Sequence, residues 1–369
     1  MKKLKKIYDI CPKRHIWAGI SALIIILHLA LRNNGSLMAA LSENIIQPLH
    51  RRMAAACDYV NLSVAEILLA LAVLAVLVYI VLQTVRIIRR GEKLKTLYRT
   101  VITLLSAGLA VYAGFCILWG TYYYGNDYVN KAGLDDGPVS VEQLKTVTEY
   151  FAKMANEYSY YVNRDADGCY APDYDEILAK SPEVFKNTEE LYPCLAGPAV
   201  HAKGIFHSRV MSYTDFTGFF FPFTAEANVN TDCPGCYFAA TVAHELSHQR
   251  GVAREQDANF TAVLASLNYS DPDYVYSACL LAYTHLGNAL YSADYEAWEE
   301  IYLSLNENIL RDFARNRAYW KQFDDTVTQK VSNTVYENFL YSYDQNLGLK
   351  SYGACVDLLV NYYYETACG

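Results

Sequence analysis

Two histidines and one glutamate stand at a spacing that can hold a metal ion. His244, Glu245 and His248 form an H-E-x-x-H pattern that follows an apolar, helix-compatible run. On an α-helix, His244 and His248 lie one turn apart on one face, so their imidazoles can bind the same zinc ion (Zn²⁺). Glu245 then points beside the metal, where its carboxylate can serve as general base toward a water molecule. This pattern is typical of zinc-dependent peptidases.

A catalytic zinc needs a third protein ligand and one open position for water. Our candidate is Glu255, although a continuous helix would place it about 16 Å along the axis from His244. Gly251 can end the first helix, because glycine tolerates the left-handed conformation of a C-cap. A second helix that begins near Arg254 would return Glu255 to the metal. On that helix Asn259 could accept a hydrogen bond from the outer nitrogen of His244 and orient the ring.

Two alternative ligand sets follow from the same run of residues. Asp257 remains an alternative to Glu255 as the third ligand. Arg254 stands where the metzincin pattern H-E-x-x-H-x-x-G-x-x-H has its third histidine. An arginine stays protonated and cannot bind zinc, so we reject the metzincin interpretation.

The residues after the histidines carry a resemblance to known families. The run E-Q-D-A-N at 255–259 resembles the E-x-x-A-D element that supplies the third ligand in membrane-embedded zinc proteases of the HtpX and Ste24 kind, with Asn259 in place of their Asp. The longer run H-E-L-S-H-Q-R-G-V-A-R-E-x-x-A-N-F resembles the H-E-L-A-H-Q-R-G-F-A-R-E-x-E-A-N-F of a bacterial membrane family, domain of unknown function 3810. The likeness extends to 223–230 and 351–353. It implies N-terminal membrane segments and a zinc site, without an established substrate.

One tyrosine is a further candidate for chemistry. Zinc peptidases often add a Tyr, His or Arg that hydrogen-bonds the oxyanion of the tetrahedral intermediate. Tyr352, in the Ser-Tyr-Gly motif that the resembled family shares, is our candidate for this catalytic role. The chain has 33 tyrosines, so packing is the alternative role for any one of them.

Composition and charge indicate a membrane protein. Of 369 residues, 53% are hydrophobic and only 19% are charged. Residues 1–100 hold 15 Lys and Arg against 5 Asp and Glu, a net +10, whereas the remainder has a net charge of −18. A basic leader before an acidic body is expected of a membrane anchor with an exterior domain, and the acidic body argues against nucleic acid as a partner.

Three apolar segments are long enough to cross the lipid bilayer, at about 16–31, 64–82 and 101–119. Basic residues precede the first segment and follow the second, so we expect the N-terminus and the 86–100 loop to be cytoplasmic. Everything after Trp119 is then extracytoplasmic. In this scheme Arg51 and Arg52 lie on the less expected side of the membrane.

We expect a membrane region at 1–124, a linker at 125–140 and an extracytoplasmic, zincin-like metallohydrolase domain at 141–369. Its fold is mainly α with a small β portion, because only 204–230 shows strand patterning. Ala225–Val229 is our candidate for an edge strand that pairs with an extended peptide substrate. Within it, Glu226 either meets a substrate amine or is a solvated carboxylate. The helices expected after Phe260 include 272–291, 295–323, 327–343 and 352–364.

The cysteines and one further histidine have mainly structural interpretations. Cys233-Pro-Gly-Cys236 is expected to close a small disulfide loop, and Cys169 with Cys194 is a possible second pair. His285 has apolar neighbours in sequence, which favours a core histidine over a ligand.

The sequence therefore predicts a membrane-anchored zinc metallohydrolase, a peptidase acting on peptide or protein outside the membrane. Two alternatives stay open. The domain could keep the zinc fold as a non-catalytic sensor or structural membrane protein, or the H-E-x-x-H match could be accidental. The oligomeric state does not follow from the sequence.

Overall fold

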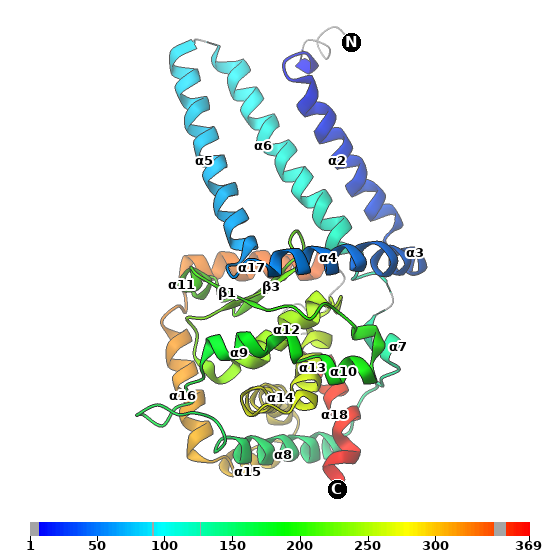
Figure 1. Cartoon of the computed structure of the whole chain (residues 1–369), viewed down its shortest axis with the longest axis vertical. Coiled ribbons are helices and arrows are strands. Elements are labelled where there is room, and N and C mark those ends of the chain that lie inside the picture. Colours follow the sequence, from blue (N-terminus) through cyan, green and yellow to red (C-terminus); the bar gives the residue numbers. More distant parts are fainter. Residues whose placement is uncertain (1–6, 91, 126, 343–351) are drawn as a thin grey trace. The chain divides into compact units, whose positions relative to one another are not determined.

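The computed structural model describes residues 7–90, 92–125, 127–342 and 352–369 (Figure 1). It is 73% helix and 4% strand, which confirms the prediction of a mainly α protein with a small β portion. The chain forms two compact units. The membrane unit comprises Met1–Pro48, Val64–Asn126 and Pro222–Thr224. The helical unit comprises Leu49–Ser63, Asp127–Phe221 and Ala225–Gly369.

The membrane unit is built on three long apolar helices, α2 (Pro12–Leu31), α5 (Val64–Arg90) and α6 (Lys93–Phe115), which is prolonged by the π-helical turn η2 (Cys116–Gly120). Each is long and apolar enough to cross a membrane, so a helix of the required length and composition lies at each of the three predicted spans. Helix α6 packs against both α2 and α5. Two shorter elements, α3 (Gly35–Leu41) and η1 (Ser42–Ile46), complete this unit.

The helical unit has a core of five helices. They are α8 (Val141–Tyr158), α12 (Phe238–Gln249), α13 (Glu255–Tyr269), α14 (Pro272–Ala293) and α18 (Tyr352–Cys368). Helix α14 contacts the other four, and α12 also contacts α13. The start of α8 is fixed by a capping box between Ser140 and Gln143.

Shorter helices surround this core. They are α4 (Gln47–Asp58), α7 (Tyr128–Ala132), α9 (Tyr174–Lys180), η3 (Ser181–Glu183), α10 (Lys186–Leu191), η4 (Pro193–Leu195), α11 (Ser208–Ser212), η5 (Gly235–Tyr237), α15 (Tyr295–Leu303), α16 (Glu307–Lys321) and α17 (Val327–Ser342).

Tyrosines fill much of the core, and several of them hydrogen-bond through their hydroxyls. Tyr274 and Tyr276 on α14 are fully buried. The Tyr274 hydroxyl donates to the carbonyl of Ile177 (2.9 Å), and the Tyr276 hydroxyl donates to the carboxylate of Asp312 (2.6 Å). Each ring buries a large apolar surface while its polar end stays bonded. This accounts for part of the high tyrosine content as packing.

A three-stranded sheet lies beside α12 and corrects the expected edge strand. Its order is β1 (Lys203–Ile205), β3 (Glu226–Asn230), β2 (Gly218–Phe221), with β1 parallel and β2 antiparallel to β3. The segment proposed as an edge strand is therefore central and fully buried. Its polar side chains are held internally; Asn228, for example, accepts a hydrogen bond from Ser63 (2.7 Å). Glu226 is only 2% exposed, so the solvated interpretation of this residue is wrong.

Two further segments differ from the sequence expectations. The expected linker contains α7, whose Tyr128 and Val129 belong to the core of the helical unit. The single helix expected over 295–323 is two helices, α15 and α16. Asn306 separates them by capping α16, since its side chain accepts a hydrogen bond from the backbone N–H of Ile309.

The expected disulfides are absent, because all ten cysteines are free thiols. The Cys233 sulfur faces the carbonyl of Asn230 at 3.1 Å. Burial raises the pKa of Cys233 to about 12 and raises that of Cys236 as well. Both therefore stay protonated at neutral pH and behave as small core side chains.

Candidate metal centre

Helix α12 presents the H-E-x-x-H residues from a buried position. The helix packs on β2 and β3 on one side and on α13 and α14 on another. His248 and Glu245 are buried, and His244 is nearly so. The two imidazole rings lie 4.6 Å apart, centroid to centroid, and are perpendicular to each other. This is the arrangement that one helical turn imposes on two side chains of one face.

The chain reverses between α12 and α13 as the sequence predicts. Helix α12 ends at Gln249, and Gly251 adopts the left-handed conformation with φ of +90°. Arg254 is extended and forms the N-cap of α13, which begins at Glu255. The acidic residues in the first turn of α13 are favoured by the helix dipole. The turn brings Glu255 back to the histidines.

The residues between His248 and Glu255 stabilise this turn through contacts with other elements. The Gln249 amide donates to the carbonyl of Ala225 (2.8 Å), which ties the end of α12 to the residue before β3. The buried Arg250 guanidinium bonds Glu189 on α10 (3.0 Å), and burial lowers its pKa to about 10. Arg254 forms an ion pair with Asp127 (2.9 Å).

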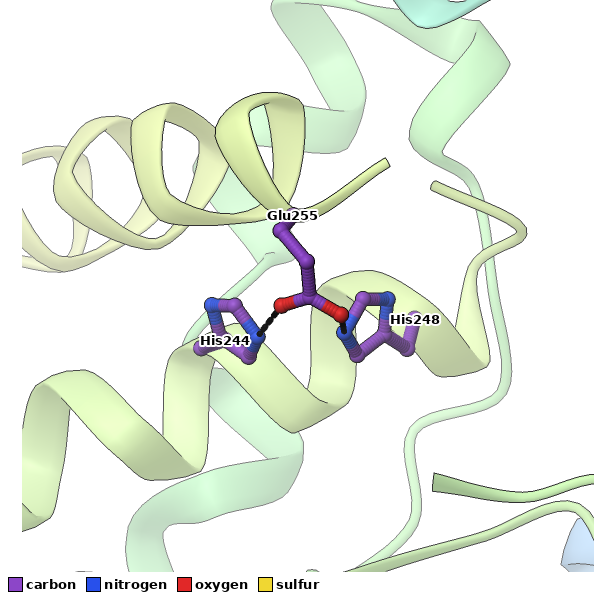
Figure 2. Close-up of side chains that lie close together, drawn as sticks. All are labelled: His244, His248 and Glu255. Carbon is purple, nitrogen blue, oxygen red and sulfur yellow. Dashed lines mark ion pairs between the residues drawn. The ribbon is translucent and has the colours of Figure 1, made fainter. Parts of the chain in front are cut away.

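His244, His248 and Glu255 converge on one point, with their ligand atoms all within 4.8 Å of one another. Figure 2 shows the carboxylate between the two rings. Glu255 Oε2 lies 3.2 Å from Nε2 of His244, and Oε1 lies 3.7 Å from Nε2 of His248. Ligands about 2.0–2.2 Å from a tetrahedral zinc are themselves about 3.3–3.6 Å apart. The His244–Glu255 separation is close to this range and the others are wider, so the three residues can hold a metal ion if they draw together around it.

Contacts behind the rings fix which nitrogen faces the centre. His244 Nδ1 bonds the side-chain oxygen of Asn259 (2.9 Å), as the sequence predicts. His248 Nδ1 bonds the carbonyl of Val252 (2.7 Å), a contact that sequence reasoning missed. With both Nδ1 atoms donating to oxygen, both Nε2 atoms are left to face the cluster as acceptors, as neutral metal ligands require.

A tyrosine that the sequence did not single out also reaches the cluster. The hydroxyl of Tyr336 on α17 donates to Oε1 of Glu255 at 2.8 Å. Its ring contacts Phe216 edge-on, with centroids 5.3 Å apart. No local signal distinguishes Tyr336 among the tyrosines, because it is the packing of α17 that brings it here.

The cluster is electrostatically paired even without a metal. Burial disfavours the charged imidazole of His248, but the Glu255 carboxylate outweighs burial and raises the pKa of His248 to about 9. Burial also opposes ionisation of Glu255, yet the two histidines hold its pKa well below the usual value. Two nitrogen donors and an anionic oxygen are therefore available to a cation that displaces the proton.

Glu245 is held apart from this pairing. Burial raises the pKa of its carboxyl to about 7, and among the described residues none hydrogen-bonds its Oε2. The Glu245 carboxylate occupies space that is left open at the start of β2, where residue 218 is a glycine. A Cβ on Gly218 would lie 2.5 Å from Oε1 of Glu245, so only glycine fits there without displacing the carboxylate. Sequence reasoning missed Gly218.

The remaining candidate residues lie outside the cluster or outside the described part of the chain. Asp257 is buried on α13 and outside the cluster, and burial raises its pKa to about 7. His285 is buried on α14, as predicted for a core histidine. Helix α18 begins at Tyr352, whose side chain lies outside the described part of the chain, as does all of Ser351.

These features define a class: a membrane protein with three candidate spans and a helical unit that gathers two histidines and a glutamate at one point. The chain belongs to the family described as "Protein of unknown function (DUF3810)", whose model matches residues 42–360. This confirms the closer of the two resemblances. No match was found among curated proteins or among solved structures, so the likeness to HtpX and Ste24 proteases has no support beyond the 255–259 run.

Proposed function

We propose that this protein is a zinc-dependent metallohydrolase, most simply a peptidase with a zincin-like site. The observation that carries the proposal is the convergence of His244, His248 and Glu255 with an unbonded carboxylate oxygen of Glu245 beside them. Three protein ligands that leave a fourth position open are typical of catalytic zinc, whereas structural zinc sites are usually closed by four. A purely structural site also has no use for Glu245.

The roles of the side chains follow from their surroundings. Zinc, when bound, acts as a Lewis acid and makes water acidic enough to ionise near neutral pH. Glu245, whose carboxyl pKa is raised by burial to about 7, would accept a proton from the attacking water and return it to the leaving amine. Asn259 holds the ring of His244 in place. Tyr336, a hydroxyl donor next to Glu255, takes the oxyanion-binding role for which the sequence offered Tyr352.

The sheet supports a peptide as substrate. Strand β2 is at an edge of the described sheet, and its first residue, Gly218, lies against Glu245. An extended peptide that pairs with the outer side of β2 would run past the carboxylate and be held by main-chain hydrogen bonds. The substrate-binding strand of the proposal is thus β2, in place of the segment Ala225–Val229.

The proposal includes an orientation. The positive-inside rule puts the N-terminus and the basic turn between α5 and α6 in the cytoplasm, with the helical unit outside. Leu49–Ser63 lies between the first two spans and Asp127 follows the third, so a three-span chain leaves both on one side, consistent with their joint membership of the helical unit. Arg51 is engaged there, since it donates to the carbonyl of Ala196 (2.5 Å).

The test is zinc content and peptide hydrolysis of the purified full chain, compared with Glu245→Gln. We expect about one zinc per chain in both proteins, and at least a hundredfold loss of hydrolysis in the variant, because positioned acid–base groups contribute about 10²–10⁴-fold. Glu307→Gln, an exposed carboxylate on α16, is the matched control and should keep both properties.

Three results would change the conclusion. Folded wild type without zinc would mean that the H-E-x-x-H match is accidental. Bound zinc with no hydrolysis of any peptide in a broad library would favour the non-catalytic sensor. A Glu245→Gln variant that keeps full hydrolysis would exclude Glu245 as the general base.

A further inference from the structure

The membrane unit contains an open cavity of about 840 Å³ where α2, α5 and α6 approach one another at their basic ends. The side chains that line it and matter here are Lys13, Arg14, Gln83, Arg86, Thr96 and Arg99. They come from all three spans. A basic loop is usually a topology signal whose charges are solvated separately. Here the folded helices bring the charges to one cavity.

The positive side chains around the cavity outnumber the negative ones. Within the described residues, no ion pair involves any of the four cations that line the cavity. The lining includes one carboxylate, Glu92, which pairs with Lys95 (3.1 Å). Four like charges around one cavity repel one another, and an anion between them would relieve that repulsion.

The guanidinium groups are held in place by uncharged acceptors. Arg14 donates to the carbonyl of Arg99 (3.2 Å), Arg99 donates to the carbonyl of Ile10 (3.1 Å), and Arg86 donates to the side-chain oxygen of Gln83 (3.4 Å). A guanidinium has five N–H donors, so each retains donors for a ligand. These bonds orient the cations without neutralising them.

The base of the cavity and the helix ends add to its polarity. Gln83 and Thr96 are buried, with 6% and 8% of their surface exposed, and give the cavity polar walls inside the bundle. Helices α2 and α6 both begin here, and neither N-cap, Cys11 or Glu92, supplies a side-chain cap. Two N-termini without a side-chain cap contribute partial positive charge.

We propose that this cavity binds the phosphate group of an anionic phospholipid. Phosphate matches the fixed arginine donors, which bind its oxygens in pairs. A lipid supplies this phosphate because the helices next to the cavity present apolar side chains outward, among them Ile88 (74% exposed) and Leu97 (52% exposed). Acyl chains can lie along them while the headgroup sits among the cations. This inference does not depend on the zinc site.

The test measures lipid binding to the detergent-purified full chain by native mass spectrometry. The probes are dioleoyl phosphatidylglycerol and, as the neutral comparison, dioleoyl phosphatidylcholine. We expect phosphatidylglycerol to bind at least tenfold more tightly. The double variant Arg86→Gln/Arg99→Gln should lose most of this preference. Its matched control, Arg89→Gln/Lys93→Gln, removes two exposed cations of the same helices that do not line the cavity, and should keep the preference within about twofold.

A single variant and a soluble competitor distinguish lipid binding at the cavity from unfolding of the variant and from binding of free phosphate. Arg86→Gln alone removes a side chain whose hydrogen bond is to Gln83 on its own helix, so it preserves the contacts that join α2 to α6 and should still weaken phosphatidylglycerol binding about threefold. Soluble glycerol 3-phosphate should not compete at millimolar concentration. Equal binding of the two lipids, equal losses in both double variants, or full competition by glycerol 3-phosphate would each overturn the proposal.

Discussion

The cluster of His244, His248 and Glu255 in the helical unit and the basic cavity of the membrane unit differ in how their charges are balanced. In the cluster, the Glu255 carboxylate lies between two imidazoles, so the protein supplies both signs of charge and holds the site together without a ligand. In the cavity, Arg14, Arg86 and Arg99 supply one sign only, and neutral acceptors position them. The first site is complete before a ligand binds, whereas the second gains its counter-charge only from a ligand.

Burial separates the two sites further. The cluster is largely shielded from water, so His248 and Glu255 have strongly shifted pKa values and are expected to respond to pH. The cations of the cavity are mostly open to solvent, so salt screens them. Four experiments use this contrast, from the largest expected effect to the smallest.

The strongest test of the cluster removes its anionic member. Glu255→Gln should lower zinc affinity by more than about 100-fold, since loss of an outer hydrogen-bond partner alone costs about 10–100-fold. Asp257→Asn is the matched control, because Asp257 is a carboxylate two residues away on the same helix and outside the cluster. Zinc titration with a competing chelator measures both. If Asp257→Asn loses zinc while Glu255→Gln retains it, the ligand set is wrong.

A smaller effect is expected behind the ring of His244. Asn259→Ala removes the acceptor at 2.9 Å from Nδ1 and should weaken zinc binding about 10- to 100-fold. Asn259→Asp keeps an acceptor and adds charge, so it should bind zinc at least as tightly as wild type. The same chelator competition measures both variants. An unchanged affinity in Asn259→Ala would mean that packing alone orients His244.

The effect of pH can be isolated at His285, a buried histidine near the cluster. Burial first, and then the charge of His244, lowers the pKa of His285 to about 4. The unfolded chain takes up the proton near pH 6.5, while the folded chain resists until about pH 4. The free energy of unfolding of the zinc-free protein should therefore fall as pH drops through this window, by on the order of 2 kcal/mol from this group.

His285→Gln should flatten that decline, as measured by denaturant unfolding between pH 7 and pH 4. His207→Gln removes an exposed histidine from the surface of the same unit and serves as the comparison. An equally steep decline in His285→Gln and wild type would show that other groups cause the acid sensitivity.

The smallest of the four effects is expected from salt, which should weaken lipid binding at the cavity more than zinc binding at the cluster. Raising NaCl from about 0.1 to 0.5 M shortens the screening length to less than half. Phosphatidylglycerol binding at the open cavity should weaken severalfold. Zinc binding at the buried cluster should change by less than about twofold, measured in parallel on the same preparation. Equal salt dependence would remove the contrast between the sites.

Local signals explain what could be predicted from the sequence. Apolar runs of sufficient length predicted the three spans, and the structure has helices there. This prediction was possible because the length of an apolar run depends only on consecutive residues. The reversal between His248 and Glu255 was also predictable, since Gly251 marks where the helix can end. These are properties of a few consecutive residues.

Contacts between distant segments could not be predicted. Tyr336 reaches Glu255 from 81 residues away, and Gly218 meets Glu245 through a strand pairing that no short pattern specifies. The same limit produced the wrong edge strand, because alternation indicates a strand but not its neighbours. For the basic cavity, the charges of the 86–100 loop were evident, but their meeting with Arg14 depends on helix packing.

The contact between Gly218 and Glu245 also links two positions in evolution. A side chain at 218 and a carboxylate at 245 compete for one space, since even a Cβ would approach to 2.5 Å. In a family member without an acidic residue at the position of Glu245, the position of Gly218 no longer has to be glycine. Comparing this pair of positions across the family would therefore separate members that keep the proposed chemistry from those that retain only the scaffold.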